Sequence, residues 1–228
     1  MHVEIVRPRD LDGEADVAVV IDIFRATSTA TTLLAEQTDT MAIAATPAEV
    51  LAHGEAVPRP LVFSEISQLD VPMDRVDNSP SVAKQLELAG RTPVLVTTNG
   101  TRTVDAVADR VNTILLGSFL SLSALVHHLR SLAPRRVFVV PAGSFSRNAS
   151  HIEDDLCAEA IRTLLADGEH DPEEVVRAVR ASERYDRRVR GNANFEADAE
   201  IALSHDIYTV VPVVRRESGL FWATPATT

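Results

Sequence analysis

The sequence predicts a three-layer α/β/α fold with a mostly parallel or mixed sheet. Short apolar runs typical of buried strands alternate with segments of helical periodicity through most of the 228 residues. The run at 17–24 is apolar at almost every position, as in strands whose two faces are both covered by helices. No repeat or linker-like tract interrupts the alternation, so we expect a single α/β unit over 1–228. Two closely packed subdomains dividing near 110–120 are the alternative.

The first half of the chain alternates apolar runs with helical segments that carry recognisable ends. Proline is favoured in the first turn of a helix, and Thr46-Pro47 therefore predicts a helix start. Gly90 predicts a helix end, and Asp77-Asn78-Ser79-Pro80 predicts a turn that closes an irregular segment at 66–81. The expected elements are an edge strand at 2–7, a central strand at 17–24, a helix at 26–37, a strand at 41–45, a helix at 47–53, a strand at 61–63 and a helix at 81–89.

The second half continues the same alternation. Val94, Leu95 and Val96 form an apolar run that stops in Thr97-Thr98-Asn99-Gly100, and a segment of helical periodicity follows. The charged helix at 172–185 is expected to present a solvated face, and the tail from 217 onward is loosely specified. The remaining expected elements are helices at 101–110, 122–132, 152–166 and 172–185, a helical segment at 192–205, and strands at 94–96, 113–116, 136–140 and 208–214.

Composition limits the classes of partner. The formal net charge of −11 argues against nucleic acid or an anionic membrane, because both require a basic surface. The single cysteine, Cys157, cannot form an intrachain disulfide and fits a reducing compartment. Residues 1–10 are polar, and the apolar run at 17–24 is too short to cross a bilayer. We therefore expect a cytoplasmic protein without nucleic-acid or membrane partners.

Polar side chains follow the predicted strands at the points where the strands end. In sheets of this class, ligands bind beyond the carboxyl ends of the strands, so these side chains should converge. Carboxylates suit Mg²⁺, and arginines with helix N-termini suit phosphate. Together they predict metal-assisted chemistry on a phosphate ester. The converging residues are Asp22, Arg25, Glu65, Asn99, Thr101, Arg102, Ser118, Gly143, Glu153, Asp154 and Asp155.

Each candidate also has an ordinary structural interpretation. Asp22 ends an apolar strand, where a carboxylate is costly unless it is paired, binds metal or caps the next helix. Arg102 opposes the dipole of the helix it begins, which favours an anion-binding role over that of a surface arginine. The acidic run at 153–155 is favoured by the helix dipole without any function. His151 is a candidate general acid or base, or an ordinary loop histidine.

Taken in order, these strings resemble the 2-phosphosulfolactate phosphatase (ComB) family. They are V-V-I-D-I-F-R-A-T-S-T (19–29), N-S-P (78–80), T-T-N-G-T-R (97–102), G-S (117–118), A-G (142–143) and E-D-D-L-C-A (153–158). The resemblance implies an α/β fold and Mg²⁺-dependent hydrolysis of 2-phospho-3-sulfolactate to sulfolactate and phosphate. The matching motif positions expected around the site are Asp22, Arg25, Asn99, Arg102, Glu153 and Asp154.

The leading hypothesis is a Mg²⁺-dependent phosphoric monoester hydrolase acting on a small anionic phosphate ester. The sequence leaves open whether Asp22 is a metal ligand or a nucleophile. A homodimer is expected from base rates alone. The expected catalytic residues are Asp22, Arg25, Asn99 and Arg102; the substrate contacts Ser28, Asn78, Ser79, Thr98, Gly100, Thr101 and Gly143; and the Mg²⁺ ligands Asp22, Glu65, Glu153 and Asp154.

The segment 64–77 departs from the family pattern. The family usually carries G-E-R-x-G, whereas this chain keeps Glu65 but lacks the arginine and glycines around it. Arg75 and Asp77 stand where the family usually has G-F-D-L-G before N-S-P. The altered segment supports two alternatives: turnover of another phosphate ester, such as a sugar or nucleotide phosphate, and non-hydrolytic binding of a phosphorylated metabolite.

Overall fold

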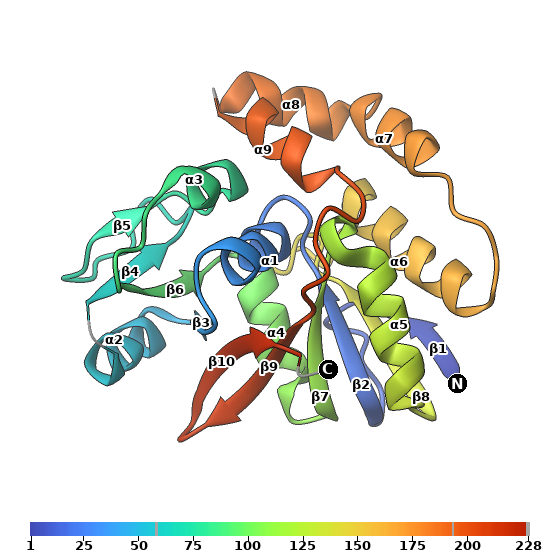
Figure 1. The fold of residues 1–228 in the computed structure, drawn as a ribbon, viewed down its shortest axis with the longest axis horizontal. Helices are drawn as coiled ribbons and strands as arrows, with labels where there is room; N and C mark the ends of the chain where they lie inside the picture. Colours follow the sequence, from blue (N-terminus) through green and yellow to red (C-terminus); the bar gives the residue numbers. More distant parts are fainter. Residues whose placement is uncertain (58, 193, 227–228) are drawn as a thin grey trace.

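A computed structural model describes residues 1–57, 59–192 and 194–226, and within them the strands form one ten-stranded mixed sheet (Figure 1). The strand order is β1-β8-β2-β7-β9-β10-β3-β6-β4-β5. One half of the sheet is parallel and contains β1 (His2–Ile5), β8 (Arg136–Pro141), β2 (Ala15–Ile21) and β7 (Val111–Gly117). The other parallel half contains β3 (Met41–Ala44), β6 (Thr92–Val96), β4 (Pro60–Phe63) and β5 (Arg75–Val76).

An antiparallel hairpin, β9 (Pro212–Glu217) and β10 (Leu220–Pro225), joins the two halves by pairing with β7 and β3. Ser218 and Gly219 link its strands with φ of 51° and 82°, as a two-residue hairpin turn requires. The expectation of a loosely specified tail from 217 was therefore wrong, and the strand expected at 208–214 begins only at Pro212. The Ser-Gly pair was the available signal for this turn.

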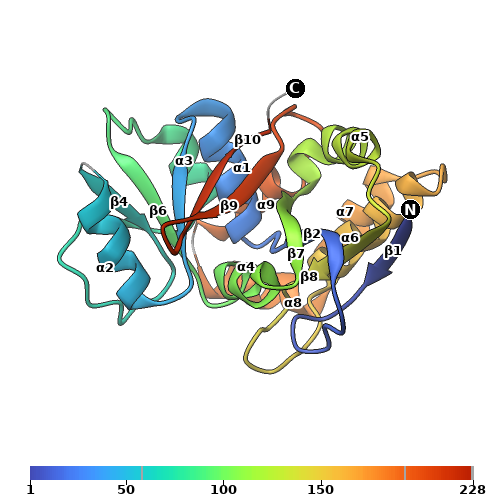
Figure 2. The ribbon, with the colours of Figure 1, turned by 90° about the horizontal axis from the view of Figure 1, so that it is seen from below.

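Helices cover both faces of the sheet, which confirms the three-layer α/β/α prediction (Figures 1 and 2). In β2, Val17, Val19 and Ile21 pack on one face against α5 (Leu122–Leu132) and α6 (Ile152–Leu165). Ala18 and Val20 face the opposite way, toward α1 (Ala26–Glu36) and α4 (Gly100–Ala108). Burying each larger aliphatic side chain contributes roughly 1.5–3 kcal/mol, so β2 anchors both layers. The remaining helices of the layers are α2 (Pro47–Ala56), α3 (Pro80–Gln85) and a 3-10 turn, η1 (Phe119–Ser121).

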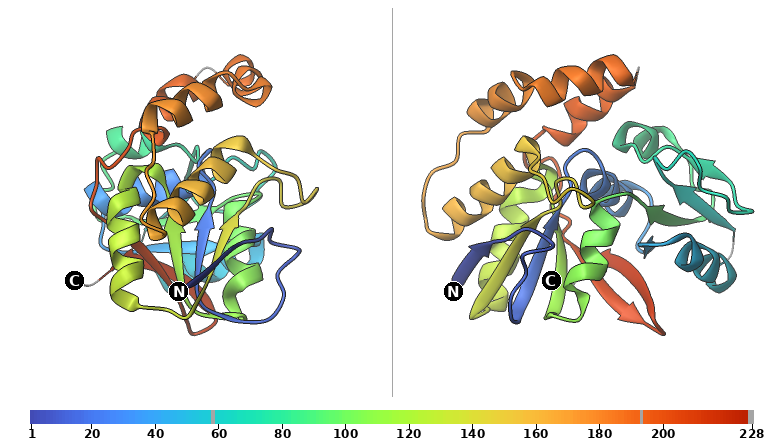
Figure 3. Two further views of the ribbon diagram at one scale, coloured as in Figure 1. Left: turned by 90° about the vertical axis from the view of Figure 1, so that its right-hand side faces the viewer. Right: turned by 180° about the vertical axis from the view of Figure 1, so that it is seen from behind.

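Three short helices, α7 (Pro172–Arg180), α8 (Glu183–Gly191) and α9 (Phe195–Ala202), cross the top of the molecule (Figures 1 and 3). The single helix expected at 172–185 is divided because Ser182 caps a new helix, its hydroxyl accepting from the N–H of Tyr185. Only 195–202 of the segment expected to be helical at 192–205 is helix. Tyr185 and Phe195 pack with Phe24, which lies three residues beyond the end of β2, and hold these helices over the strand end.

No helix among the described residues is long and apolar enough to cross a membrane. The division into subdomains near 110–120 stays a prediction.

A histidine pair lies beside η1 and predicts pH-dependent stability. The rings of His170 and His205 are 5.2 Å apart, and each buries an Nε2 atom that has no hydrogen-bond partner in the described structure. Burial lowers the pKa of both imidazoles, so the folded state prefers them neutral. The stability from this preference is present above the unfolded pKa of about 6.5 and is lost as the pH falls below it.

We therefore expect the melting temperature to fall between pH 7.5 and 5.5. The His170→Gln/His205→Gln double variant should show a flatter pH dependence, whereas His127→Gln, on an exposed residue, should follow the wild type. Thermal melts at both pH values test this. A double variant as pH-sensitive as the wild type contradicts it.

Candidate active site

A cavity of about 410 Å³ opens where strands of both parallel halves of the sheet end. Asp22 follows β2 and Ser144 follows β8 in one half, while Glu65 follows β4 and Thr98 follows β6 in the other. The cavity therefore exists only because the two halves lie side by side, as expected for a ligand site beyond the carboxyl ends of strands. Its lining residues are Asp22, Phe24, Arg25, Glu65, Asn78, Thr98, Asn99, Arg102, Ser144, Ser146, Arg147, His151, Arg184 and Arg188.

Asp22 is fixed against the first turn of α4. Its side chain is buried, and Oδ2 accepts a hydrogen bond from the Gly100 N–H at 2.8 Å. Burial, followed by the charges of Asp154 and Glu65, raises the pKa of Asp22. A cation or a proton at this carboxylate would relieve the repulsion, which makes Asp22 a candidate functional group of the cavity.

Gly100 permits this close approach of α4 to the end of β2. A Cβ at this position would lie 2.7 Å from the Ala26 Cβ and 2.8 Å from the Asp22 Oδ2. Both neighbours are short and fixed in the core, so neither can give way. The glycine in T-T-N-G-T-R is thus required by packing against the site carboxylate.

Gly100→Ala is expected to lower stability by about 1–3 kcal/mol, as overpacking does, and to reduce activity by displacing Asp22. Gly191→Ala is the matched control, because a Cβ there has nothing within 4 Å. Thermal melts and initial rates of both variants test the prediction. Equal behaviour of the two variants would contradict it.

Asp154 connects the segments that follow β2 and β8. It is fully buried, and its two oxygens accept from the N–H groups of Ile23 (2.7 Å) and Gly143 (3.0 Å). Gly143 has a φ of +54°, and a Cβ there would lie 2.1 Å from the Ala149 carbonyl oxygen. Asp154 therefore shapes the strand ends that carry the lining residues.

Glu65 joins the loops of the second half of the sheet. Its Oε1 accepts from the Thr98 N–H (2.8 Å) and hydroxyl (3.0 Å), and its Oε2 accepts from the Asn78 amide (3.0 Å). The Oδ1 atom of Asn78 is buried and has no hydrogen-bond partner within the described part of the chain. An oxygen left in this state, on a side chain that contacts the Glu65 carboxylate, is a candidate cation ligand.

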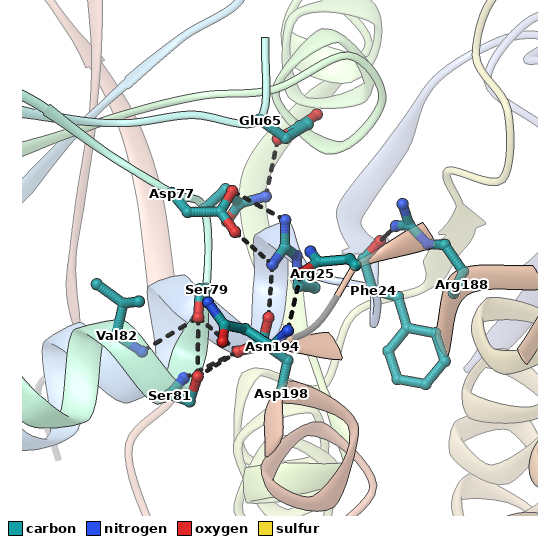
Figure 4. Close-up of polar contacts among 12 residues, drawn as sticks. Phe24, Arg25, Glu65, Asp77, Ser79, Ser81, Val82, Arg188, Asn194 and Asp198 are labelled. Carbon is teal, nitrogen blue, oxygen red and sulfur yellow. Dashed lines mark hydrogen bonds and ion pairs between the residues drawn. The ribbon is translucent and has the colours of Figure 1, made fainter. Parts of the chain in front are cut away.

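Arg25, which a cis peptide bond joins to Phe24, is bound by the protein's own carboxylates (Figure 4). The Arg25 guanidinium donates two hydrogen bonds to the Asp77 carboxylate, at 2.8 and 3.0 Å. Its Nη1 also donates to Asp198 at 2.5 Å. Asp198 is fully buried and also accepts from the hydroxyls of Ser79 (2.5 Å) and Ser81 (2.6 Å). The arginine thus links the start of α1, the segment between β5 and α3, and α9 at the edge of the cavity.

Two lining arginines, Arg184 and Arg188, come from α8 and were missed by sequence reasoning. Arg184 pairs with Glu153 at 2.7 Å, and Arg188 donates to the Phe24 carbonyl oxygen at 2.7 Å. Residues four apart share one helical face, which places both at the cavity. The solvated face expected for the helix at 172–185 was wrong at Arg184, and Arg188 lies beyond the end of that expected helix. The available sequence signal was that Arg184 and Arg188 lie four positions apart, on either side of the aromatic Tyr185.

His151 lies at the start of α6 and lines the cavity. Its Nδ1 is 3.7 Å from Asp154 Oδ2. Burial first, and then the charge of Arg184, lowers its pKa to about 4, although Glu153 acts in the opposite direction. The imidazole is therefore neutral at pH 7 and able to accept a proton.

The structure separates the predicted site residues into two layers. Those that line the cavity are Asp22, Arg25, Glu65, Asn78, Thr98, Asn99 and Arg102. Those that lie outside its lining and instead hold local backbone or neighbouring side chains are Ser28, Ser79, Gly100, Thr101, Gly143, Glu153 and Asp154.

The oxygen donors of the cavity fit a magnesium ion. Mg²⁺ usually takes one or two carboxylates and completes its shell with waters and substrate oxygens. Asp22, Glu65 and the unpartnered Asn78 Oδ1 are donors of this kind. Glu153 already forms an ion pair with Arg184, and Asp154 already accepts hydrogen bonds from two backbone N–H groups. Among the described residues, no three His, Cys, Asp or Glu side chains could hold a metal by themselves, so such an ion would need substrate or water ligands.

Comparison with known proteins gives a consistent family match. The sequence model of the 2-phosphosulpholactate phosphatase family matches residues 5–217, which include every lining residue of the cavity. A probable 2-phosphosulfolactate phosphatase of Thermotoga maritima is 32% identical over 213 residues, covering 88% of this chain and 90% of the relative. Another from a Nostoc species is 27% identical over 241 residues, covering 96% of each chain. A third, from Thermoplasma acidophilum, is 26% identical over 204 residues, covering 90% of this chain and 88% of the relative.

Proposed function

This chain belongs to the 2-phosphosulpholactate phosphatase family and is a phosphoric monoester hydrolase, and we propose that its substrate is 2-phospho-3-sulfolactate, cleaved to sulfolactate and phosphate. The supporting observation is the cavity itself, where the buried carboxylate of Asp22 lies among five arginines in a protein of net charge −11. Such a local excess of cations draws a small, highly charged anion into the site.

The arginines supply the electrostatic part of the reaction. A phosphoryl group passes through a transition state whose charge is spread over its equatorial oxygens, and fixed cations stabilise that charge. The first turn of α4 contributes less, because the N–H groups of Gly100 and Thr101 already donate to Asp22 and Thr97. Arg25 is held by two carboxylates, so its guanidinium stays in one orientation while the substrate binds.

We propose that Mg²⁺ completes the site, held by Asp22 and Glu65, with Asn78 Oδ1 as a further ligand. When bound, the ion would neutralise phosphate charge during the reaction. His151, neutral at pH 7, would hydrogen-bond the attacking water, and its pKa of about 4 makes it too weak a base to hold the proton.

Metal removal tests the ion. Wild-type protein with Mg²⁺ is expected to release phosphate from 2-phospho-3-sulfolactate. EDTA should reduce the rate by at least about 100-fold, since the ion supplies several kcal/mol of charge stabilisation, and excess Mg²⁺ should restore it. Full activity in EDTA would overturn the metal proposal, and no phosphate release under any condition would overturn the phosphatase proposal.

A second candidate is hydrolysis of a different phosphate ester. The specific observation is Asp77, a residue of the divergent segment 64–77, which forms a bidentate pair with Arg25 at the cavity edge. Comparing kcat/KM for phosphosulfolactate with values for sugar and nucleotide phosphates separates the two. The homodimer, the cytoplasmic location and the absence of a nucleic-acid partner stay predictions.

A further inference from the structure

The five arginines that line the cavity differ in how their charges are compensated. Arg25 is paired with two carboxylates and Arg184 with one. The other three, Arg102, Arg147 and Arg188, have no carboxylate partner within the ranges 1–57, 59–192 and 194–226. These three positive charges are therefore available to a ligand.

Arg188 is the inner one of the three. It is partly buried, and the bond from Nη2 to the Phe24 carbonyl oxygen holds it beside the segment that begins with Asp22. Its Nε–H is buried and has no partner among the described residues. Burial lowers the pKa of Arg188, whereas the negative charge of Asp22 raises it. The two side chains therefore interact electrostatically. A partly buried guanidinium with an unpartnered, buried N–H is stabilised when an anion binds to it.

Arg102 and Arg147 are the outer two. Both are exposed, one in the first turn of α4 and the other in the loop after β8. The Asn99 side chain accepts from the Phe145 N–H at 3.0 Å and so fastens the loop to the start of α4. Arg102 and Arg147 thus lie on two connected segments, and both line the cavity.

We propose that the cavity contains two anion subsites with separate tasks. The inner subsite, at Arg188 beside Asp22, binds the phosphoryl group that is transferred. The outer subsite, between Arg102 and Arg147, binds a second anionic group of the same substrate. That second group is the sulfonate or the carboxylate of the proposed substrate, and the inference assigns which arginines bind each anion. This division rests on the proposed function in taking that ester as the substrate.

The inner subsite is tested with Arg188→Gln against Arg187→Gln, an exposed neighbour in the same helix. Titration with inorganic phosphate should show a dissociation constant about 30-fold or more higher for Arg188→Gln, because a charge-assisted pair to phosphate is lost. Arg187→Gln should match the wild type. Because a structural role would affect stability and not phosphate affinity alone, thermal melts accompany the titrations. Phosphate binding within about threefold of wild type in Arg188→Gln overturns the inner subsite.

The outer subsite is tested with Arg102→Gln and Arg147→Gln on two substrates. Glycerol 2-phosphate has the same three-carbon skeleton as 2-phospho-3-sulfolactate but carries a hydroxymethyl group in place of the carboxylate and a hydroxyl in place of the sulfonate. Each variant should raise KM for phosphosulfolactate about 10-fold more than KM for glycerol 2-phosphate. 2-Phosphoglycerate, which keeps the carboxylate alone, distinguishes the sulfonate from the carboxylate as the bound group. Equal KM changes on all three esters overturn the outer subsite.

The same experiment separates this inference from the proposed function. If the wild type turns over no ester, the proposed function fails. Titrations with inorganic phosphate and phosphosulfolactate then still decide the two subsites, because they require only binding. If the wild type is active but both arginine sets change all affinities equally, the function stands and the division is wrong.

Discussion

Asp22→Asn is expected to reduce kcat for phosphate release by about 1,000-fold or more, with the fold intact. The amide has the same shape and can still accept the Gly100 N–H bond. It lacks the negative charge that either a metal ligand or a nucleophile requires at this position. The expected loss is therefore the same for both roles of Asp22.

Stability measurements show whether the loss of activity in Asp22→Asn comes from the missing charge or from unfolding. Burial and the charges of Asp154 and Glu65 raise the folded-state pKa of Asp22, so its ionised form destabilises the metal-free protein increasingly as the pH rises above the unfolded value of about 3.9. In EDTA at pH 7.5, Asp22→Asn should be at least as stable as the wild type. Asp39→Asn, at an exposed position, is the control. Activity above a tenth of wild type, or a lower melting temperature in EDTA, would contradict this account.

Asp198→Ala is expected to lower the free energy of unfolding by about 3–5 kcal/mol, which is the usual cost of breaking a buried ion pair. For a chain of this size, that corresponds to a fall in Tm of roughly 6–20 °C. Asp198 is fully buried and accepts from Arg25 and from the hydroxyls of Ser79 and Ser81. Its removal leaves Arg25 with Asp77 as its one remaining carboxylate partner in the described structure and takes the charged acceptor away from the buried Ser79 and Ser81 hydroxyls.

Asp77→Ala is the matched comparison, because Asp77 binds the same guanidinium but its side chain is 37% exposed. Water can replace the lost oxygens there, so its cost should be about 1 kcal/mol or less. Asp198→Asn, which keeps the volume and removes the charge, should fall between the two alanine variants. Denaturant titrations of the three proteins test this order. An Asp198→Ala variant no less stable than Asp77→Ala would show that burial does not set the strength of this network.

The site residues that lie at the end of an apolar run could be predicted from the sequence. Asp22, Glu65, Asn99 and Arg102 each follow or interrupt an apolar run, and the rule that parallel strands present their carboxyl ends together was enough to place them around one cavity. Arg184 and Arg188 follow no strand. They reach the cavity because α8 lies over the strand ends, and their helix alone looks like any charged, exposed segment.

Sequence by itself determined the alternation of strands and helices, the two covered faces of the sheet and the strand-end residues, because each depends on periodicity within a few neighbouring positions. Only the tertiary structure decided what those residues touch. In the folded chain, Arg25 pairs with Asp198, which is 173 positions away, and Arg188 donates a hydrogen bond to the carbonyl oxygen of Phe24, which is 164 positions away. The tertiary structure thereby left the charge of Arg188, and not that of Arg25, available to an anion. Partners so distant in the chain are chosen by packing across the whole fold, and no local pattern of residues carries that information.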